Sequence, residues 1–382
     1  MRDLLAERLL ATVMGWTQED VARERPDLQA MAAYKYDEYQ QFSPGMRFVE
    51  SLALWLNQFE TALERVAAYK FVKERLLFCS TAELNHLVRI AYPDHIRSRL
   101  LRKIAAETGY NERHVAKVAG SVKFKTRQRQ CLFLGLSDGA HIDVFRRSNS
   151  PELSHEQMLQ TYEISPERVE SLLKKLTDDM ANLLGSAVPD YMQKFRTVIL
   201  LDDLSASGTS YLDREQDGTF GGKIGRFYKS VTNPNSAASR LVDLQHAEIF
   251  VVLYMATERA YLYLENVLRE MWEPLGTEYA VIVVHLLKDE NCLKPGDGNA
   301  FGGLLHAYYD QTIEDEHTRK GGTDDLKYGF AACGLPLVLS HNTPNNSLYL
   351  LWAESEKVRA LFPRVSRHIG STGIGETDEG TA

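Results

Sequence analysis

The sequence has few cysteines and no long apolar run, and both absences exclude classes of protein. Its 382 residues contain four scattered cysteines without a CxxC pair, so we expect reduced side chains in or near the core, not a zinc site or a disulfide framework. No apolar stretch approaches the ~20 residues that a transmembrane helix needs. Charged residues begin at Arg2, which argues against a signal peptide. We therefore expect a cytoplasmic protein that does not associate with membranes.

A strong excess of one charge is also absent. The net charge is −8, which gives no overall attraction to nucleic acid, so such binding would need a local basic patch. Apolar residues make up 44% of the chain and charged residues 25%, as in ordinary soluble globular proteins. The length is sufficient for a large core and for two structural units.

Residues 197–211 carry the clearest pattern in the chain. Residues 198–201 form an apolar run without polar alternation, which predicts a strand buried on both faces at the centre of a parallel sheet. Asp202 and Asp203 end this run, and a small-residue turn leads to Tyr211, where we expect a helix to begin. The turn is Ser205-Ala206-Ser207-Gly208-Thr209-Ser210.

This order of elements suits a sugar phosphate. Backbone N–H groups and hydroxyls of such a turn bind a phosphate dianion, and a following helix dipole adds to this attraction. Two carboxylates at a strand end accept ribose hydroxyls directly or through Mg²⁺. A doubly wound domain whose strand ends in two acids and a plain turn would explain the same residues.

The stretch resembles the phosphoribosyl-pyrophosphate (PRPP) motif of type I phosphoribosyltransferases, in which four apolar residues, two acids and a Ser/Thr-Gly-Ser/Thr loop follow one another. The resemblance implies that Asp202 and Asp203 act in catalysis and bind ribose and metal, and that residues 205–210 bind the 5′-phosphate. One departure is Ala206, which stands where hypoxanthine- and guanine-type salvage enzymes carry a basic Asp. Adenine-type members also have Ala there.

A second buried strand is predicted over Cys131–Leu136, before the turn Ser137-Asp138-Gly139-Ala140. Type I phosphoribosyltransferases place their pyrophosphate loop after such a strand, and Arg146 or Arg147 would supply a cation. A simple turn with surface arginines explains the residues equally well. A helix predicted from Ser165 to about 185 completes a strand–helix–strand unit, so the two strands should be parallel.

Two further apolar runs, 248–255 and 278–287, predict more strands of the same sheet. These runs predict an α/β fold with an open, mainly parallel sheet, and the resemblance implies that this sheet is of the type I phosphoribosyltransferase kind. The polar segment 213–235 predicts an exposed loop, or a lid in which cations such as Lys223 close over an anionic ligand. A last strand, 335–342, leads to polar residues that would contact a base or sugar, or stabilise a turn. These residues are His341, Asn342, Asn345 and Asn346.

Residues 1–128 predict an α-helical extension before an α/β domain at 129–362, and residues 363–382 predict a disordered tail. Residues 99–122 have helix-turn-helix spacing, and the many cations up to Arg129 would suit contact of 99–129 with a nucleic-acid backbone. Two packed helices with a solvated basic connector explain this pattern as well.

Several segments together resemble one family more closely, over roughly residues 45–355. They are Leu134–Ala140, the PRPP-like motif, Gly222–Phe227 and Cys333–Ser347. The family is the phosphoribosyltransferase-like family associated with bacterial conflict systems. It implies a helical extension, a setting in anti-phage defence and an effector role beside a partner protein.

We therefore expect binding of PRPP or a nucleotide with Mg²⁺, and transfer or cleavage of a phosphoribosyl group. No general base can be identified. The alternative is a non-catalytic sensor of PRPP or a nucleotide that regulates a partner protein or nucleic acid through the helical extension. The sequence does not identify the acceptor of the phosphoribosyl group, and it is compatible with a monomer or a homo-oligomer.

Overall fold

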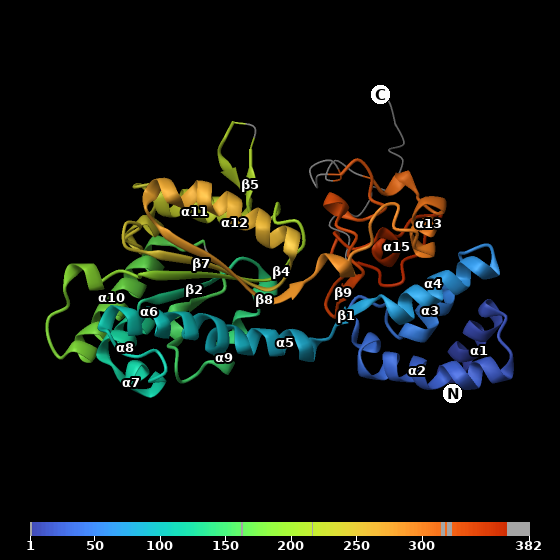
Figure 1. Ribbon diagram of the computed structural model, residues 1–382, viewed down its shortest axis with the longest axis horizontal. Coiled ribbons are helices and arrows are strands. Elements are labelled where there is room, and N and C mark those ends of the chain that lie inside the picture. The colour runs from blue at the N-terminus through green and yellow to red at the C-terminus, as the bar shows by residue number, and fades with distance from the viewer. Residues whose placement is uncertain (1, 162, 216, 315–317, 319–322, 365–382) are drawn as a thin grey trace, which may run out of the picture.

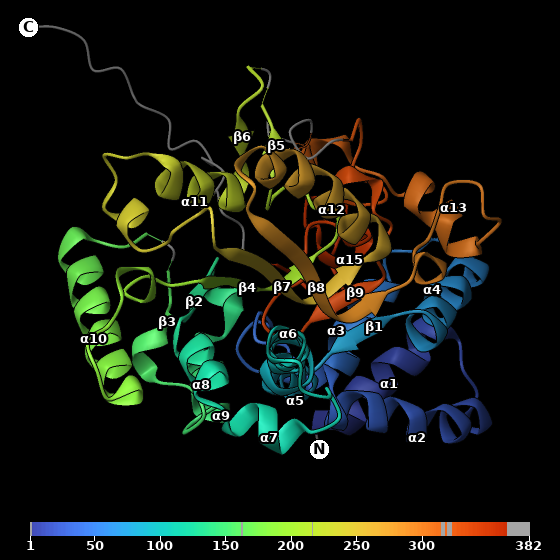
Figure 2. The ribbon, with the colours of Figure 1, turned by 60° about the vertical axis from the view of Figure 1, so that its left-hand side comes forward.

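The computed structural model describes residues 2–161, 163–215, 217–314, 318 and 323–364. Its centre is a five-stranded parallel sheet with the strand order β3-β2-β4-β7-β8 (Figures 1 and 2). The strands are β2 (Cys131–Gly135), β3 (Met158–Leu159), β4 (Thr197–Ser205), β7 (Glu248–Thr257) and β8 (Glu278–Leu287). The predicted α/β class, the parallel β2–β4 pair and the central place of the strand after residue 197 are confirmed.

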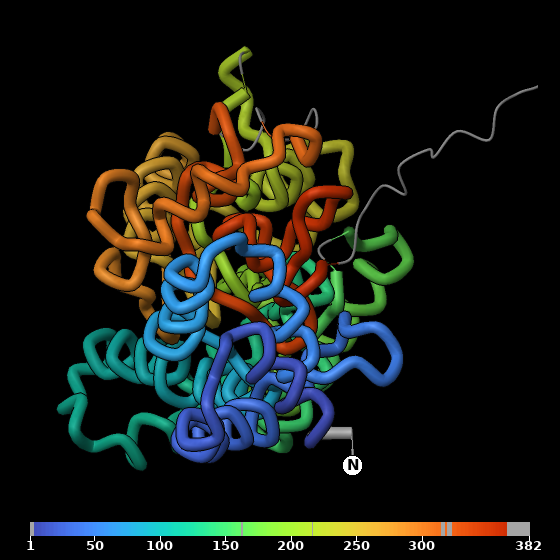
Figure 3. The backbone as a smooth tube through the Cα atoms, turned by 90° about the vertical axis from the view of Figure 1, so that its right-hand side faces the viewer, coloured from blue at the N-terminus to red at the C-terminus, as the bar shows by residue number. Residues whose placement is uncertain are grey.

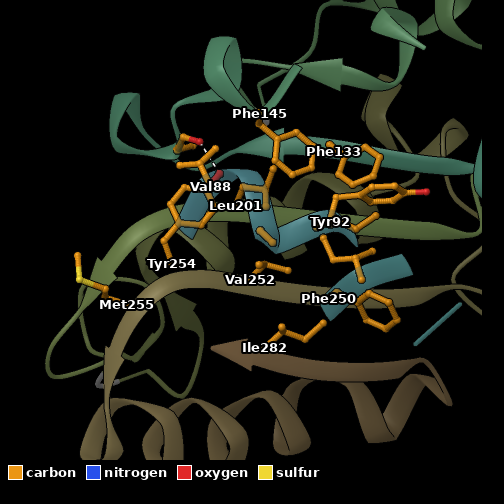
Figure 4. Packing of buried hydrophobic residues seen from close by; sticks show 14 of the residues in the cluster. Val88, Tyr92, Phe133, Phe145, Leu201, Phe250, Val252, Tyr254, Met255 and Ile282 are labelled. Carbon is orange, nitrogen blue, oxygen red and sulfur yellow. Dashed lines mark hydrogen bonds between the residues drawn. The ribbon is translucent and has the colours of Figure 1, made fainter. Parts of the chain in front are cut away.

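Helices cover both faces of the sheet, because strands without polar alternation must be buried on both sides. One face packs against α10 (Pro166–Leu184), α11 (Gly222–Thr232) and α12 (Glu258–Trp272). The other packs against α5 (Thr81–Ile90), α6 (Ser98–Thr108), α7 (Val115–Gly120), α8 (Val122–Arg129) and α9 (Ile142–Ser148). Tyr92, Phe133 and Phe250 lie in this second layer of side chains (Figure 4).

A separate hydrophobic core joins the two ends of the chain. Its buried side chains come from residues 10–78 and 293–362, which lie side by side at one end of the sheet (Figures 1 and 3). The elements are α1 (Arg2–Met14), α2 (Gln18–Tyr34), α3 (Phe48–Leu56), α4 (Ala62–Glu74), β1 (Leu77–Cys79), α13 (Ala300–Ala307), β9 (Leu337–Leu339) and α15 (Tyr349–Trp352). We call the described parts of residues 2–79 and 289–364 the terminal module.

The last predicted strand, 335–342, is present as the shorter strand β9. It pairs in parallel with β1 inside the terminal module and does not join the five-stranded sheet. The boundary at residue 128 stays a prediction, although the buried side chains of α5 to α8 belong to the core of the sheet. The predicted tail, 363–382, lies almost entirely outside the described residues.

Two expectations around the PRPP-like motif are wrong. β4 does not end before the acids, because its pairing with β7 continues to Ser205, so Asp202 and Asp203 lie within the strand. No helix begins at Tyr211. A turn leads instead into the hairpin of β5 (Asp213–Arg214) and β6 (Phe220–Gly221), which stands above the sheet next to α11 and α12 (Figure 2), and α11 begins at Gly222.

The predicted helix order over residues 99–122 is present, with α6 ending at Gly109 in a left-handed conformation before α7. Several of the cations that follow are held by carboxylates. Arg127 is buried and bonds to Glu248 (2.9 Å), and Arg129 bonds to Asp179 (2.6 Å). These two side chains stabilise the fold and are not available to a nucleic-acid backbone. No helix among the described residues is long and apolar enough to cross a membrane.

Candidate functional site

The acid pair lies near the carboxyl end of β4, where successive side chains of a strand point in opposite directions. Asp202 is fully buried and accepts hydrogen bonds from the Ser137 hydroxyl (2.5 Å) and the Lys223 ammonium (2.6 Å). Asp203 accepts the Leu204 N–H (2.7 Å), and its other carboxylate oxygen lies 3.4 Å from Nε2 of His341. Asp202 therefore contacts α11 through Lys223, whereas Asp203 contacts the terminal module through His341.

These surroundings shift the pKa values of the two carboxylates in opposite directions. Burial, together with the Asp203 charge, raises the pKa of Asp202 against the opposing effect of Lys223. Burial also acts on Asp203, but the neighbouring His341 imidazole outweighs it and holds the pKa of Asp203 below its usual value. Asp203 is therefore the more stably ionised member of the pair.

The predicted pyrophosphate loop, Ser137–Ala140, packs directly against the acids. A Cβ atom on Gly139 would lie 2.5 Å from Cγ of Asp203, so any other residue here would force the loop or the carboxylate to shift. Tyr254, seen in Figure 4, donates its hydroxyl to the Ala140 carbonyl (2.7 Å) and fixes the end of the loop. Within the described ranges, the backbone N–H groups of Asp138 and Gly139 bond to no acceptor.

The predicted 5′-phosphate loop, Ser205–Ser210, leaves β4 next to the helix α12. The N-cap residue of α12, Thr257, donates its hydroxyl to the Ala206 carbonyl (2.7 Å). Gly208 has a φ of +86° and packs so closely on Tyr263 that a Cβ would lie 2.5 Å from its ring. Because no helix follows the loop directly, any anion here depends on the loop itself and not on a helix dipole.

The donors of this loop are free to bind such an anion. In the part of the chain that the structure describes, the backbone N–H groups of residues 207–210 bond to no acceptor. The hydroxyls of Ser207 and Thr209 lie 2.9 Å apart and bond to each other, and Ser210 is exposed. Such a turn of unpaired N–H groups and hydroxyls forms an anion-binding concavity.

Two histidines flank the acid pair, and only His341 was identified from the sequence. The ring of His141 lies edge to face with that of His341, with centroids 5.8 Å apart. His141 has a φ of +44°, and its buried Nε2 has no hydrogen-bond partner among the described residues. Burial, followed by the His341 charge, lowers the pKa of His141. Its position directly after the pyrophosphate loop was the only sequence signal that could have indicated it.

Lys223 is the cation of the site, and the sequence suggested it only as part of a lid. The described part of residues 213–235 contains β5, β6 and α11, with Lys223 at the second position of this helix. Its ammonium lies 2.6 Å from Asp202 and 4.7 Å from the centroid of the Tyr211 ring. Of the two arginines suggested for the pyrophosphate loop, Arg146 and Arg147, the second is exposed and lies 3.7 Å from Asp143 on its own helix.

The asparagines after β9 mainly form the turn. Asn346 donates its side-chain amide to the Phe330 carbonyl (3.0 Å), and the Asn345 carbonyl accepts the Phe330 N–H (2.9 Å). The side-chain oxygen of Asn342 is buried without a partner in the described chain. Of this predicted group, the structure therefore brings only His341 into contact with the acids.

The residues that would hold a metal are the two carboxylates alone. Among the described residues, no group of three or more His, Cys, Asp or Glu side chains is placed to bind a metal ion. Hard oxygen donors nevertheless fit Mg²⁺, which proteins commonly bind through one or two carboxylates while substrate phosphates and water complete the coordination.

A protein-family model described as PRTase-CE matches residues 52–364. The matched range includes both loops, the acid pair, both histidines and Lys223. No curated protein and no solved structure matches the chain.

Proposed function

This chain belongs to the PRTase-CE family, a phosphoribosyltransferase-like family, and on this premise we propose that it binds PRPP or a nucleotide and transfers or cleaves the phosphoribosyl group. One observation carries the proposal. Two loops whose backbone N–H groups bond to no acceptor in the described part of the chain meet an acid pair at the carboxyl edge of a parallel sheet. In open α/β sheets, ligands bind in the crevice at this edge.

In the proposed complex, the loop of residues 205–210 holds the 5′-phosphate, and residues 137–140 hold the pyrophosphate. The ribose hydroxyls donate to Asp202 and Asp203. Because Asp203 is held in its ionised form, its charge also stabilises the positive charge that develops on the ribose as the glycosidic bond breaks. Mg²⁺ on these carboxylates and on the ligand oxygens would neutralise part of the phosphate charge.

A turnover assay tests this proposal. PRPP with Mg²⁺ and a panel of nucleobases, and separately nucleoside 5′-monophosphates, would be followed for release of pyrophosphate or free base. We expect Asp203→Asn to lower kcat by about 100-fold or more, the usual loss when a stabilising group in the transition state is removed. Asp178→Asn, which changes an exposed carboxylate on α10, is the control and should retain activity. Full turnover by Asp203→Asn would contradict the proposal.

A second candidate function is a ligand sensor, and the contact of His341 with Asp203 favours it. A ligand that takes over Asp203 would break this contact and alter how the terminal module is held. Saturable binding without any product, together with ligand-dependent hydrogen exchange around β9, would support the sensor. Unchanged exchange at saturating ligand would contradict it.

We also propose a role as an effector in bacterial anti-phage defence, which rests on the family resemblance. Expression of the chain with its neighbouring genes should lower phage plating, and Asp203→Asn should abolish this protection. Equal protection by both forms would contradict an effector role of the site.

A further inference from the structure

The position of Lys223 conflicts with a simple sugar-binding role for Asp202. One carboxylate oxygen of Asp202 already accepts Ser137 and the Asp203 N–H, and the other accepts the Lys223 ammonium. A carboxylate has about four lone-pair sites. Three of these sites are filled, so a ribose hydroxyl finds at most one open site on Asp202, on the oxygen that already binds Lys223, and competes with the ammonium for a full contact there.

Lys223 is the one of these groups that can move away. The Ser137 hydroxyl is held by the turn that follows β2, and the Asp203 N–H belongs to the backbone of β4. The Lys223 ammonium, in contrast, stands at the end of a flexible four-carbon side chain that is 26% exposed. Its Cα position is nevertheless well defined. Ile224 donates its N–H to the Tyr211 carbonyl (2.8 Å), and a Cβ on Gly222 would lie 2.6 Å from the same oxygen.

An anion bound to the Ser137–Ala140 loop would give this ammonium a second partner. Lys223 and Ser137 bind the same carboxylate, and Ser137 begins the loop whose Asp138 and Gly139 N–H groups are unpaired within the described residues. A pyrophosphate on this loop would therefore lie next to the ammonium. Such a group carries several negative charges, and charge-assisted bonds to it are stronger than neutral ones.

We propose that Lys223 is a positioning and specificity residue that transfers from Asp202 to the pyrophosphate group of the ligand. This inference rests on the proposed function. Without ligand, Lys223 compensates the buried charge of Asp202. With ligand, it releases Asp202 to the ribose hydroxyl and adds a contact that only a pyrophosphorylated ribose 5-phosphate can make. The site therefore selects PRPP over ribose 5-phosphate.

Calorimetric titration of both ligands, with Mg²⁺ present, tests this role. The proteins are the wild type, Lys223→Met, Lys223→Arg and Lys229→Met, the last changing another lysine of α11 as a control. We expect the wild type to prefer PRPP, and Lys223→Met to weaken PRPP binding by about tenfold or more, as for loss of one charge-assisted bond. Binding of ribose 5-phosphate should stay the same or tighten, since Asp202 is free. Lys223→Arg should keep the preference for PRPP, and Lys229→Met should behave like the wild type.

Each other result is decisive. An equal loss for both ligands, or no loss for either, would overturn the transfer and leave Lys223 as a structural partner of Asp202. Wild-type protein that binds both ligands with equal affinity would overturn the inference but not the proposed function. Wild-type protein that binds neither would refute the proposed function itself. If Lys223→Met does not fold, Lys223→Gln keeps a donor without the charge and should show the same selective loss.

Discussion

Gly139→Ala should both destabilise the protein and weaken its ligand binding. The new Cβ would lie 2.5 Å from Cγ and 2.6 and 2.7 Å from the two carboxylate oxygens of Asp203. This carboxylate cannot rotate freely, because it accepts the Leu204 N–H at 2.7 Å and faces His341 at 3.4 Å. Either the acid leaves these partners or the loop moves away from the sheet.

Both responses have a calculable size. Overpacking of this kind typically costs about 1–3 kcal/mol, and loss of a hydrogen bond to a charged group about 1.5–3 kcal/mol. The protein adopts whichever of these two responses costs less free energy. We therefore expect the free energy of unfolding to fall by about 1–3 kcal/mol. We expect the displaced loop or acid to weaken the binding free energy of PRPP by about 1.4 kcal/mol or more. This loss corresponds to an affinity lower by about tenfold or more.

Urea unfolding and calorimetric titration of PRPP measure the two effects. Gly120→Ala is the matched control, because a Cβ there has no atom within 4 Å and Gly120 lies in α7, so its stability should not fall and would rise by at most about 1 kcal/mol. If Gly139→Ala were as stable as the wild type and bound PRPP equally well, the close packing of the loop on Asp203 would be refuted.

Two further predictions concern residues next to the site, and a third concerns an ion pair that stabilises the fold. Gly208→Ala should cost about 1–2 kcal/mol from its positive φ alone, with a further cost against Tyr263, and should weaken binding of ribose 5-phosphate; unchanged binding would contradict the loop assignment. The pKa of His141 is lowered in the folded protein, so the unfolded chain binds a proton at this residue first as the pH falls below about 6.5. The free energy of unfolding therefore decreases as the pH falls from about 6.5 to the lower pKa of the folded state. Between pH 7 and 5, His141→Asn should therefore reduce the slope of stability against pH, by at most about 1.4 kcal/mol per unit; an unchanged slope in urea titrations would refute this. Arg127→Met should lower the free energy of unfolding by about 3 kcal/mol, because it removes one cation from the buried Glu248, and a thermal midpoint equal to that of the wild type would contradict the pairing.

Strands and helices could be predicted where the sequence pattern within one segment is enough to identify the element. Continuous apolar runs identified β2, β4, β7 and β8, because a strand buried on both faces needs no polar side chains. The N-cap serine at Ser165 identified α10 for the same local reason. β1, with three residues, and β5, with two, are too short to produce a periodic pattern.

The site was predictable only in its two loops and its acids. The contacts of Lys223 with Asp202 and of His341 with Asp203 join residues far apart in the sequence, and no local pattern encodes such a meeting. The shared core of residues 10–78 and 293–362 was missed for a similar reason. An amphipathic stripe shows that a helix face is buried but not which segment covers it.

Calorimetric titration of PRPP, with and without Mg²⁺, into the wild type and the double variant Asp202→Asn/Asp203→Asn tests the central claim most directly. We predict binding by the wild type that is stronger with Mg²⁺ and is lost in the double variant, whose folding is checked by thermal unfolding. Absence of binding to the wild type at millimolar PRPP, or equal binding by a folded double variant, would contradict the assignment of this acid pair and its two loops as a phosphoribosyl site.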